Sequence, residues 1–287
     1  FVIIASFLVS YYLISFYLIK LSNFSKQKNI SQQSQRWGNS NKSHLGGISF
    51  TIPILFITFI SFYLSYSGSY ELTQNDKIII SIFLIILIST FVGLIDEKFG
   101  IGPFWQFINQ ILICIILIWS GCIINITPIF YINIIFTIFW IVAFINALYL
   151  FDNVDTALGS YTTSLLCFFI FLGLINNHNY FLLLIMFSYI GSLLAFLRFN
   201  YFPSKIFMGE VGSLQLSSVL AGISIYFLWG DYSYSHYFDS FYYLLQNNLV
   251  FLIVIIDTFL ILSIRIANNV SPFKGDTNHL SHMTIKL

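Results

Sequence analysis

The chain has 287 residues, of which 58% are hydrophobic and only 8% are charged, and its mean hydropathy is +0.86. Because a soluble globular domain carries about a quarter charged residues, this composition excludes a cytosolic enzyme, a secreted disulfide scaffold and a disordered regulator. The formal net charge of +1 provides no basic field that would attract nucleic acid. Composition therefore predicts a polytopic membrane protein.

The three cysteines give no sign of a metal site or a disulfide framework. Cys114, Cys122 and Cys167 lie in apolar runs, and their spacing is not that of metal ligands. Free cysteine usually behaves as a small hydrophobic residue, so we expect all three side chains to be buried.

Nine apolar runs are candidates for membrane spans. A bilayer core of about 30 Å requires roughly 20 apolar residues in a helix. The runs lie at 1–19, 48–66, 78–95, 105–120, 129–150, 161–175, 180–197, 214–229 and 248–264. They are continuous and not alternating, which favours helices over a barrel. We predict an all-α polytopic membrane protein with one integral membrane domain over residues 1–287. Its first residue is Phe1, so we expect a longer chain around it.

The positive charges divide the connections between these runs into two sets. Eleven of the twelve Lys and Arg residues follow odd-numbered runs, and Lys77 alone lies in the other set. Short cytoplasmic loops carry such an excess of positive charge. The connections after odd-numbered runs are therefore predicted to face the cytoplasm.

Every unusual polar cluster also falls on the predicted cytoplasmic side. The clusters are KSHLGG at 42–47, GLIDEKFG at 93–100, NALYLFDNVDTALG at 146–159, FNYFPSKIFMGEVGS at 199–213 and SPFKGDTNHLSH at 271–282. Loops that are distant in sequence but share one face can converge on one site. Ionisable groups at membrane depth are costly without a function.

The carboxylates in these clusters have both functional and ordinary interpretations. Adjacent Asp96 and Glu97 fit a solvated pair at a span end, but they could also hold Mg²⁺ or accept a proton. Asp152 and Asp155 would share one face of a helix, or lie in an exposed loop. Asp257, midway along its run, is either a functional group or a polar contact between helices.

The fourth and fifth clusters carry further candidates. Gly209 and Gly212 flank Glu210 and would permit close approach of a ligand, with Glu210 as a metal ligand. His279 and His282, with Lys274 nearby, suit contact with phosphate or a metal. A merely exposed histidine pair is the simpler alternative, and the same holds for His44 beside Lys42.

Taken together and in this order, the motifs resemble those of the polyprenyl-phosphate N-acetylhexosamine-1-phosphate transferases (glycosyltransferase family 4). PSKIFMGEVGSL at 203–214 is similar to the family motif P-A-K-I-F-M-G-D-x-G-S-L, and GLIDE at 93–97 is similar to G-x-x-D-D. Asn146, Asp152 and Asp155 match N-A-x-x-x-x-D-x-x-D. The segments 257–266 and 271–282 resemble the aspartate, arginine and histidine motif of its ninth span.

The resemblance implies ten transmembrane helices around a cytoplasmic groove, with a tenth span expected after Leu287. It implies transfer of a sugar 1-phosphate, with N-acetylglucosamine 1-phosphate favoured, from a UDP-sugar to undecaprenyl or another polyprenyl phosphate. UMP would be released at the bacterial inner membrane. The implied cofactor is Mg²⁺, with Mn²⁺ as a substitute. The implied partners are the two substrates and the lipid bilayer, no nucleic acid is expected, and a homodimer is one option.

The resemblance also carries residue roles onto this chain. The catalytic set it implies is Asp96, Glu97, Asp152, Asp155, His279 and His282. The substrate-binding set is Lys42, His44, Asn146, Lys205, Arg265 and Lys274, and the metal ligands are Glu210 and Asp155.

Several positions depart from the family pattern. Glu97 and Glu210 replace aspartates, Tyr149 replaces a metal-binding asparagine, and Asn153 and Thr156 replace glycines. Because Mg²⁺ requires near-octahedral geometry, we expect weaker metal binding, with Tyr149 contributing little. A weak or inactive homologue with a lipid-binding or assembly role is the main alternative. A transporter is a lesser one, since only Asp257 lies deep in a span.

Overall fold

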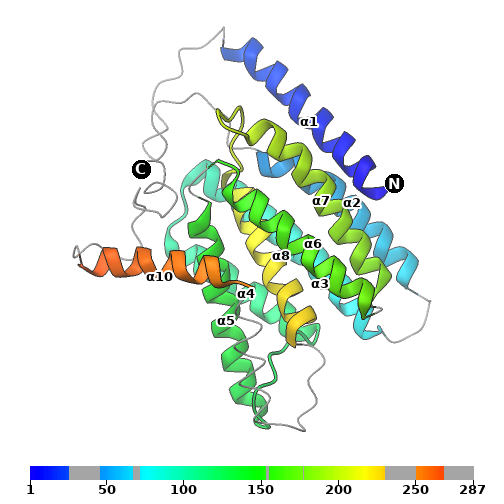
Figure 1. The fold of residues 1–287 in the computed structure, drawn as a ribbon, viewed down its shortest axis with the longest axis vertical. Coiled ribbons are helices and arrows are strands. Elements are labelled where there is room, and N and C mark those ends of the chain that lie inside the picture. The colour runs from blue at the N-terminus through cyan, green and yellow to red at the C-terminus, as the bar shows by residue number, and fades with distance from the viewer. Residues whose placement is uncertain (26–45, 67–71, 153–154, 177, 230–249, 268–287) are drawn as a thin grey trace.

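The computed structural model describes residues 1–25, 46–66, 72–152, 155–176, 178–229 and 250–267. Every regular element within these ranges is an α-helix (Figure 1). The helices are α1 Val2–Ser25, α2 Gly46–Ser65, α3 Gln74–Phe99, α4 Pro103–Trp119, α5 Phe130–Phe151, α6 Ala157–Ile175, α7 Tyr180–Asn200, α8 Gly209–Trp229 and α10 Leu252–Ala267. The prediction of an all-α polytopic membrane protein is confirmed.

Each predicted apolar run corresponds to one of these helices. Seven of them (α1, α2, α3, α5, α6, α7 and α8) are long and apolar enough to cross a membrane, and α4 is a shorter apolar helix of 17 residues. The ninth run, predicted at 248–264, corresponds to α10, whose described part comprises the 16 residues Leu252–Ala267. It crosses the other helices at a steep angle (Figure 1).

Helix α8 forms the centre of the bundle. It is buried along nearly its whole length, and it packs against α2, α3, α5 and α6. Glycines allow this close approach: a methyl group on Gly93 of α3 would meet the backbone of Val211, and one on Gly47 of α2 would meet Gly212. Helix α1 lies at the periphery against α7 and α2.

The prediction that all three cysteines are buried is wrong for one of them. Cys114 and Cys122 are buried, whereas Cys167 on α6 is exposed. The outer surface of a membrane bundle is apolar because it faces lipid, so an apolar run does not distinguish core from surface.

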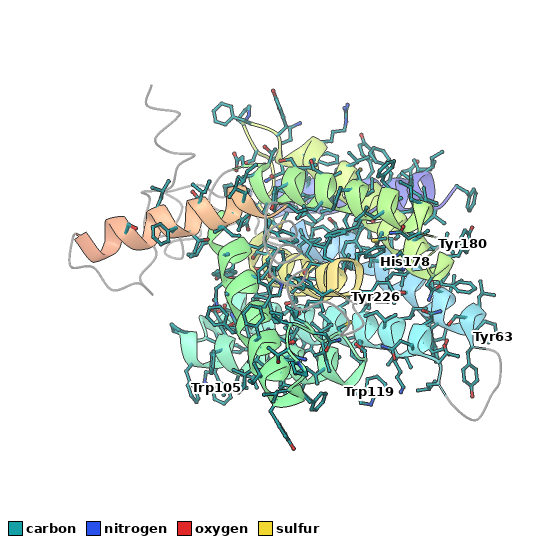
Figure 2. The ribbon with its side chains drawn as sticks, turned by 60° about the horizontal axis from the view of Figure 1, so that its bottom comes forward. Tyr63, Trp105, Trp119, His178, Tyr180 and Tyr226 are labelled. Carbon is teal, nitrogen blue, oxygen red and sulfur yellow. The ribbon has the colours of Figure 1, made fainter. Side chains whose placement is uncertain are left out.

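Exposed aromatic side chains lie toward both ends of the bundle (Figure 2). Trp105 is near the start of α4, whereas Trp119, Tyr63 and Tyr180 lie toward the other end. Each of the four side chains is at least half exposed. Trp and Tyr are enriched where a membrane meets water. Their positions are consistent with a bilayer between the two ends.

Hydrogen bonds connect the end of α7 and the segment after it to the starts of α2 and α6. The Gly46 and Gly47 amides at the start of α2 donate to Phe207 and Met208 oxygens at 3.0 and 2.8 Å. The Thr156 amide, before α6, donates to Asn200 Oδ1 at 2.7 Å. The polar clusters at 93–100, 146–159 and 199–213 therefore meet at one end, which we call the polar end.

Candidate functional site

Asp96 and Glu97 lie in the last turn of α3 and not in a loop after it. The helix ends at Gly100, whose positive φ of 64° suits glycine and whose amide donates to the Asp96 oxygen at 2.7 Å. This glycine cap explains why α3 continues past the predicted end at residue 95. It fixes both carboxyl groups on a rigid helix, where Asp96 is buried.

Glu210 lies in the first turn of α8, which begins five residues before the predicted start at 214. Gly209 precedes it with a φ of 74°, and a carboxylate is favoured at this end of a helix because the amide dipoles point toward it. The Tyr149 hydroxyl, from α5, donates a hydrogen bond to Glu210 Oε2. Tyr149 therefore positions Glu210, a contact that the sequence did not predict.

Asp152 and Asp155 flank the turn between α5 and α6. Asp152 follows the last residue of α5, and Asp155 immediately precedes Thr156. Burial raises the pKa of Asp152 well above its ordinary value, and the neighbouring carboxylates of Glu210 and Asp155 raise it further. Asp152 therefore favours its protonated form or a nearby cation.

Asn200 holds this turn against the segment after α7. Its Oδ1 accepts from the Thr156 amide, and its Nδ2 donates to the Ile206 oxygen at 2.9 Å. Asn200 is buried, and its bond to Ile206 is buried while its bond to Thr156 is partly so. One side chain thus sets the distance between two of the predicted clusters.

Two glutamines of α4 were missed by the sequence reasoning. Gln106 Nε2 donates to Asp96 Oδ2 at 2.7 Å. Gln110 exchanges two amide hydrogen bonds with Asn146, at 3.0 and 3.1 Å. The available signal was their spacing of four residues, which places two amides on one face of an apolar helix.

Five carboxyl groups gather at the polar end, and we call them the acidic cluster: Asp96, Glu97, Asp152, Asp155 and Glu210. Glu97 interacts electrostatically with Asp96 and Glu210, and Asp152 does so with Asp155 and Glu210. Glu210 therefore joins both pairs. Like charges this close are stable only when protons or a cation neutralise part of the charge.

A sequence model described as "Glycosyl transferase family 4" matches residues 79–228, more than half of the chain. The chain belongs to glycosyl transferase family 4. A phospho-N-acetylmuramoyl-pentapeptide-transferase of Streptococcus uberis is 32% identical over 200 residues, which are 63% of this chain and 58% of that protein. Proteins of the same description from Streptococcus mutans and Enterococcus hirae are 45% and 44% identical over 93 residues, 32% of this chain and 27% and 28% of theirs. The chain thus spans under two thirds of each of these relatives.

The part of the chain matched by the glycosyl transferase family 4 model contains the whole acidic cluster, together with Asn146 and Lys205. Lys205 is exposed after α7, and its amide donates to the Phe199 oxygen at 2.8 Å. Arg265 lies in α10, but its side chain is not among those that the structure describes. Asp257 of the same helix is buried. The remaining candidates lie outside the described residues: Lys42, His44, Lys274, His279 and His282.

The acidic cluster fits the Mg²⁺ that the family implies. Its oxygen donors are those that Mg²⁺ prefers, and Glu97 Oε2 is buried without a hydrogen-bond partner among the described residues. Within the described ranges, no three His, Cys, Asp or Glu residues are grouped to hold an ion by themselves. A Mg²⁺ ion held here would therefore need water and substrate phosphates to complete its shell.

Proposed function

We propose that the protein transfers a sugar 1-phosphate from a UDP-sugar to a polyprenyl phosphate. An oxygen of the lipid phosphate attacks the sugar-linked phosphorus and forms the new phosphorus–oxygen bond. The bond from that phosphorus to the bridging oxygen breaks, and UMP leaves with the oxygen and its electron pair. The product is a polyprenyl diphosphate sugar, and no covalent enzyme intermediate is required.

The observation that carries this proposal is the convergence of five carboxyl groups from α3, the α5–α6 turn and α8 within the region matched by the family. These groups are held by helix ends and by bonds from Gln106 and Tyr149. Such fixed positions favour catalysis because little reorganisation is needed when the reactants bind.

Each part of the acidic cluster has a distinct role in the proposal. Glu210 and Asp155 would hold Mg²⁺, which when bound supplies charge stabilisation for the donor diphosphate. Asp96, oriented by Gln106, would position the acceptor phosphate. Asp152, whose raised pKa makes it a stronger base, would accept the remaining proton of that phosphate when a bound cation keeps its carboxylate ionised; the second pKa of the phosphate is about 6.

Two donor sugars are supported by different observations. The tail sequence His-x-Ser-His at 279–282 resembles the hexosamine branches and favours N-acetylglucosamine 1-phosphate. The relatives are named for phospho-N-acetylmuramoyl-pentapeptide transfer, which favours the larger donor. We propose the first as the substrate and keep the second as the competing assignment.

We further propose a bacterial inner-membrane location with the acidic cluster facing the cytoplasm. The bias of eleven positive residues to one set of connections supports that orientation. Nucleotide sugars and UMP are water-soluble and the acceptor is a lipid, so a site at the end of a membrane bundle would be accessible to both.

The test is UMP release by the purified protein in lipid nanodiscs. Undecaprenyl phosphate and Mg²⁺ are supplied with UDP-N-acetylglucosamine or UDP-N-acetylmuramoyl-pentapeptide, and a chelator or omission of the acceptor serves as control. Release that requires the acceptor supports the reaction, and the faster donor decides the sugar. No release with either donor would make the chain a non-catalytic homologue.

A further inference from the structure

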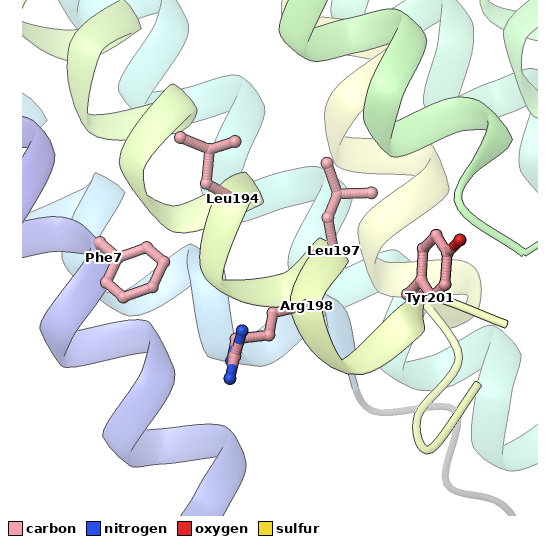
Figure 3. A pocket seen from close by; sticks show the side chains of 5 residues that line it. All are labelled: Phe7, Leu194, Leu197, Arg198 and Tyr201. Atoms are coloured by element: carbon pink, nitrogen blue, oxygen red, sulfur yellow. The ribbon is translucent and has the colours of Figure 1, made fainter. Parts of the chain in front are cut away.

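A pocket lies between α1 and α7 (Figure 3). It is lined by Phe7, Leu194, Leu197, Arg198 and Tyr201 and has a volume of about 530 Å³. It is a hollow that is largely open at the surface of the bundle. None of its lining residues belongs to α3, α4, α5 or α8, so it is separate from the proposed transferase site.

The lining is apolar except at one end. Leu194, Leu197, Arg198 and Tyr201 follow the spacing i, i+3, i+4, i+7, which places them on one face of α7 and of the cap residue after it. Leu194 is 43% exposed and Tyr201 is 73% exposed, so the pocket is open to the surroundings of the bundle. Phe7 of α1 forms the opposite wall across from Arg198 (Figure 3).

Arg198 gives the pocket its charge. It lies in the last turn of α7, at the polar end, where a membrane helix approaches the bilayer surface. Among the described residues, no hydrogen bond, ion pair or ring contact engages the Arg198 side chain. Because Arg198 is exposed at a helix end, its guanidinium can extend to the level of the lipid headgroups, and its fork geometry matches the oxygens of phosphate.

We propose that this pocket binds one anionic phospholipid from the bilayer. The acyl chain would lie against Phe7, Leu194 and Leu197, toward the bilayer interior. The phosphate would contact Arg198 at the level where headgroups lie. Tyr201, amphipathic and exposed at the same level, suits a headgroup environment. The site binds a resident lipid and is independent of the proposed transferase reaction.

Lipid titration followed by native mass spectrometry tests the proposal on the whole protein in detergent. The probes are dioleoyl phosphatidylglycerol and dioleoyl phosphatidylcholine, which share their acyl chains and differ in net charge. Arg198→Gln removes the cation, and Lys98→Gln is the matched control. Lys98 is also exposed and in the last turn of a spanning helix at the polar end, but it is not part of the pocket. Leu194→Trp fills the pocket and keeps Arg198.

The first phosphatidylglycerol should bind the unaltered protein about fivefold more tightly than phosphatidylcholine, the effect of one well-placed cation. Arg198→Gln should abolish that preference, Lys98→Gln should retain it, and Leu194→Trp should weaken binding of both lipids. Equal binding of the two lipids by the unaltered protein would overturn the proposal. So would an equal loss in both Gln variants, or displacement of phosphatidylglycerol by undecaprenyl phosphate, since the pocket would then belong to the acceptor site.

Discussion

Thr156 holds a backbone conformation that ordinarily favours glycine. Its φ is 70°, in the left-handed region, where a β-branched side chain is strained. The bond from its amide to Asn200 maintains this conformation, and the family pattern has glycine here. A hydrogen bond to Asn200 thus holds the residue after Asp155 in a conformation that glycine would adopt with less strain.

Thr156→Gly should therefore stabilise the protein. Relief of left-handed strain is worth about 1–2 kcal/mol, and the added chain entropy of glycine offsets about 0.5–1 kcal/mol of it. Thermal unfolding in detergent measures the change. Thr163→Gly, in the interior of α6, is the control and should destabilise by about 1 kcal/mol. Equal losses in both variants would show that Thr156 is not strained.

The ionised Asp152 carboxylate is repelled by the carboxylates of Glu210 and Asp155, and a neutral side chain would remove this repulsion. Because its pKa is raised on folding by burial and by Glu210 and Asp155, it costs stability above its ordinary pKa of about 3.8, increasingly as pH rises. In metal-free buffer, Asp152→Asn should raise Tm by roughly 2–4 °C at pH 8 and by less at pH 5. Turnover should fall at least about 100-fold.

Asp76→Asn provides the contrast for this measurement. Asp76 lies at the other end of α3, where its carboxylate accepts from the Thr73 amide at 3.0 Å in a capping box. Losing that contact should lower Tm at both pH values. An Asp152→Asn variant that is no more stable than the unaltered protein at pH 8 would contradict the account of a repulsive cluster.

Glu210 and Tyr149 form a pair that distinguishes this chain from the family pattern. The Tyr149 hydroxyl donates a hydrogen bond to Glu210 Oε2, so this oxygen already has a partner before any metal binds. Tyr149→Asn combined with Glu210→Asp should lower the Mg²⁺ concentration for half-maximal UMP release. An unchanged or raised requirement would show that the site is adapted to the residues it has.

At the scale of elements, the junction of α3 and α8 positions the acidic cluster. Gly93 lies one turn before Asp96 and Glu97, and an added methyl group there would meet the backbone of Val211, next to Glu210. Backbone cannot move aside as a flexible side chain can. The separation between the carboxylates of the two helices is therefore set by a glycine.

Gly93→Ala should separate α3 from α8 and cost about 1–3 kcal/mol, with a loss of turnover because Glu97 and Glu210 move apart. Gly102→Ala is the control, since a methyl group at Gly102 meets nothing within 4 Å and its φ of −71° suits alanine. Stability and turnover are measured for both. Similar behaviour of the two variants would rule out the close junction.

The helices were predictable from sequence, but their ends and partners were only partly so. Long apolar runs identified the nine helices of the described ranges, because lipid requires internally bonded backbone. The C-terminal end of α3 and the start of α8 were missed because Gly100 and Gly209 act through positive φ, which composition does not display. The burial of cysteines and the contacts of Gln106 depend on which helix face meets protein and which meets lipid, and apolar periodicity does not separate these.

At the scale of the whole molecule, the bundle brings together groups more than 100 residues apart in the chain. Asp96 and Glu210 come from helices that pack along their length, and Asn200 and Tyr149 fix the segments between them. Sequence predicted the shared end from the positive-charge bias and the motif order. The bonds of Tyr149 and Asn200 required the structure.

Transfer of radiolabelled sugar phosphate to undecaprenyl phosphate in nanodiscs tests the central claim most directly, with Asp96→Asn compared with Asp76→Asn. Both variants remove one carboxylate charge from α3, but at opposite ends of the helix. If the acidic cluster is the transferase site, Asp96→Asn should lose at least about 100-fold of the rate, and Asp76→Asn should keep it. Unaltered transfer by Asp96→Asn, or equal losses in both, would contradict the assignment of the reaction to this end of the bundle.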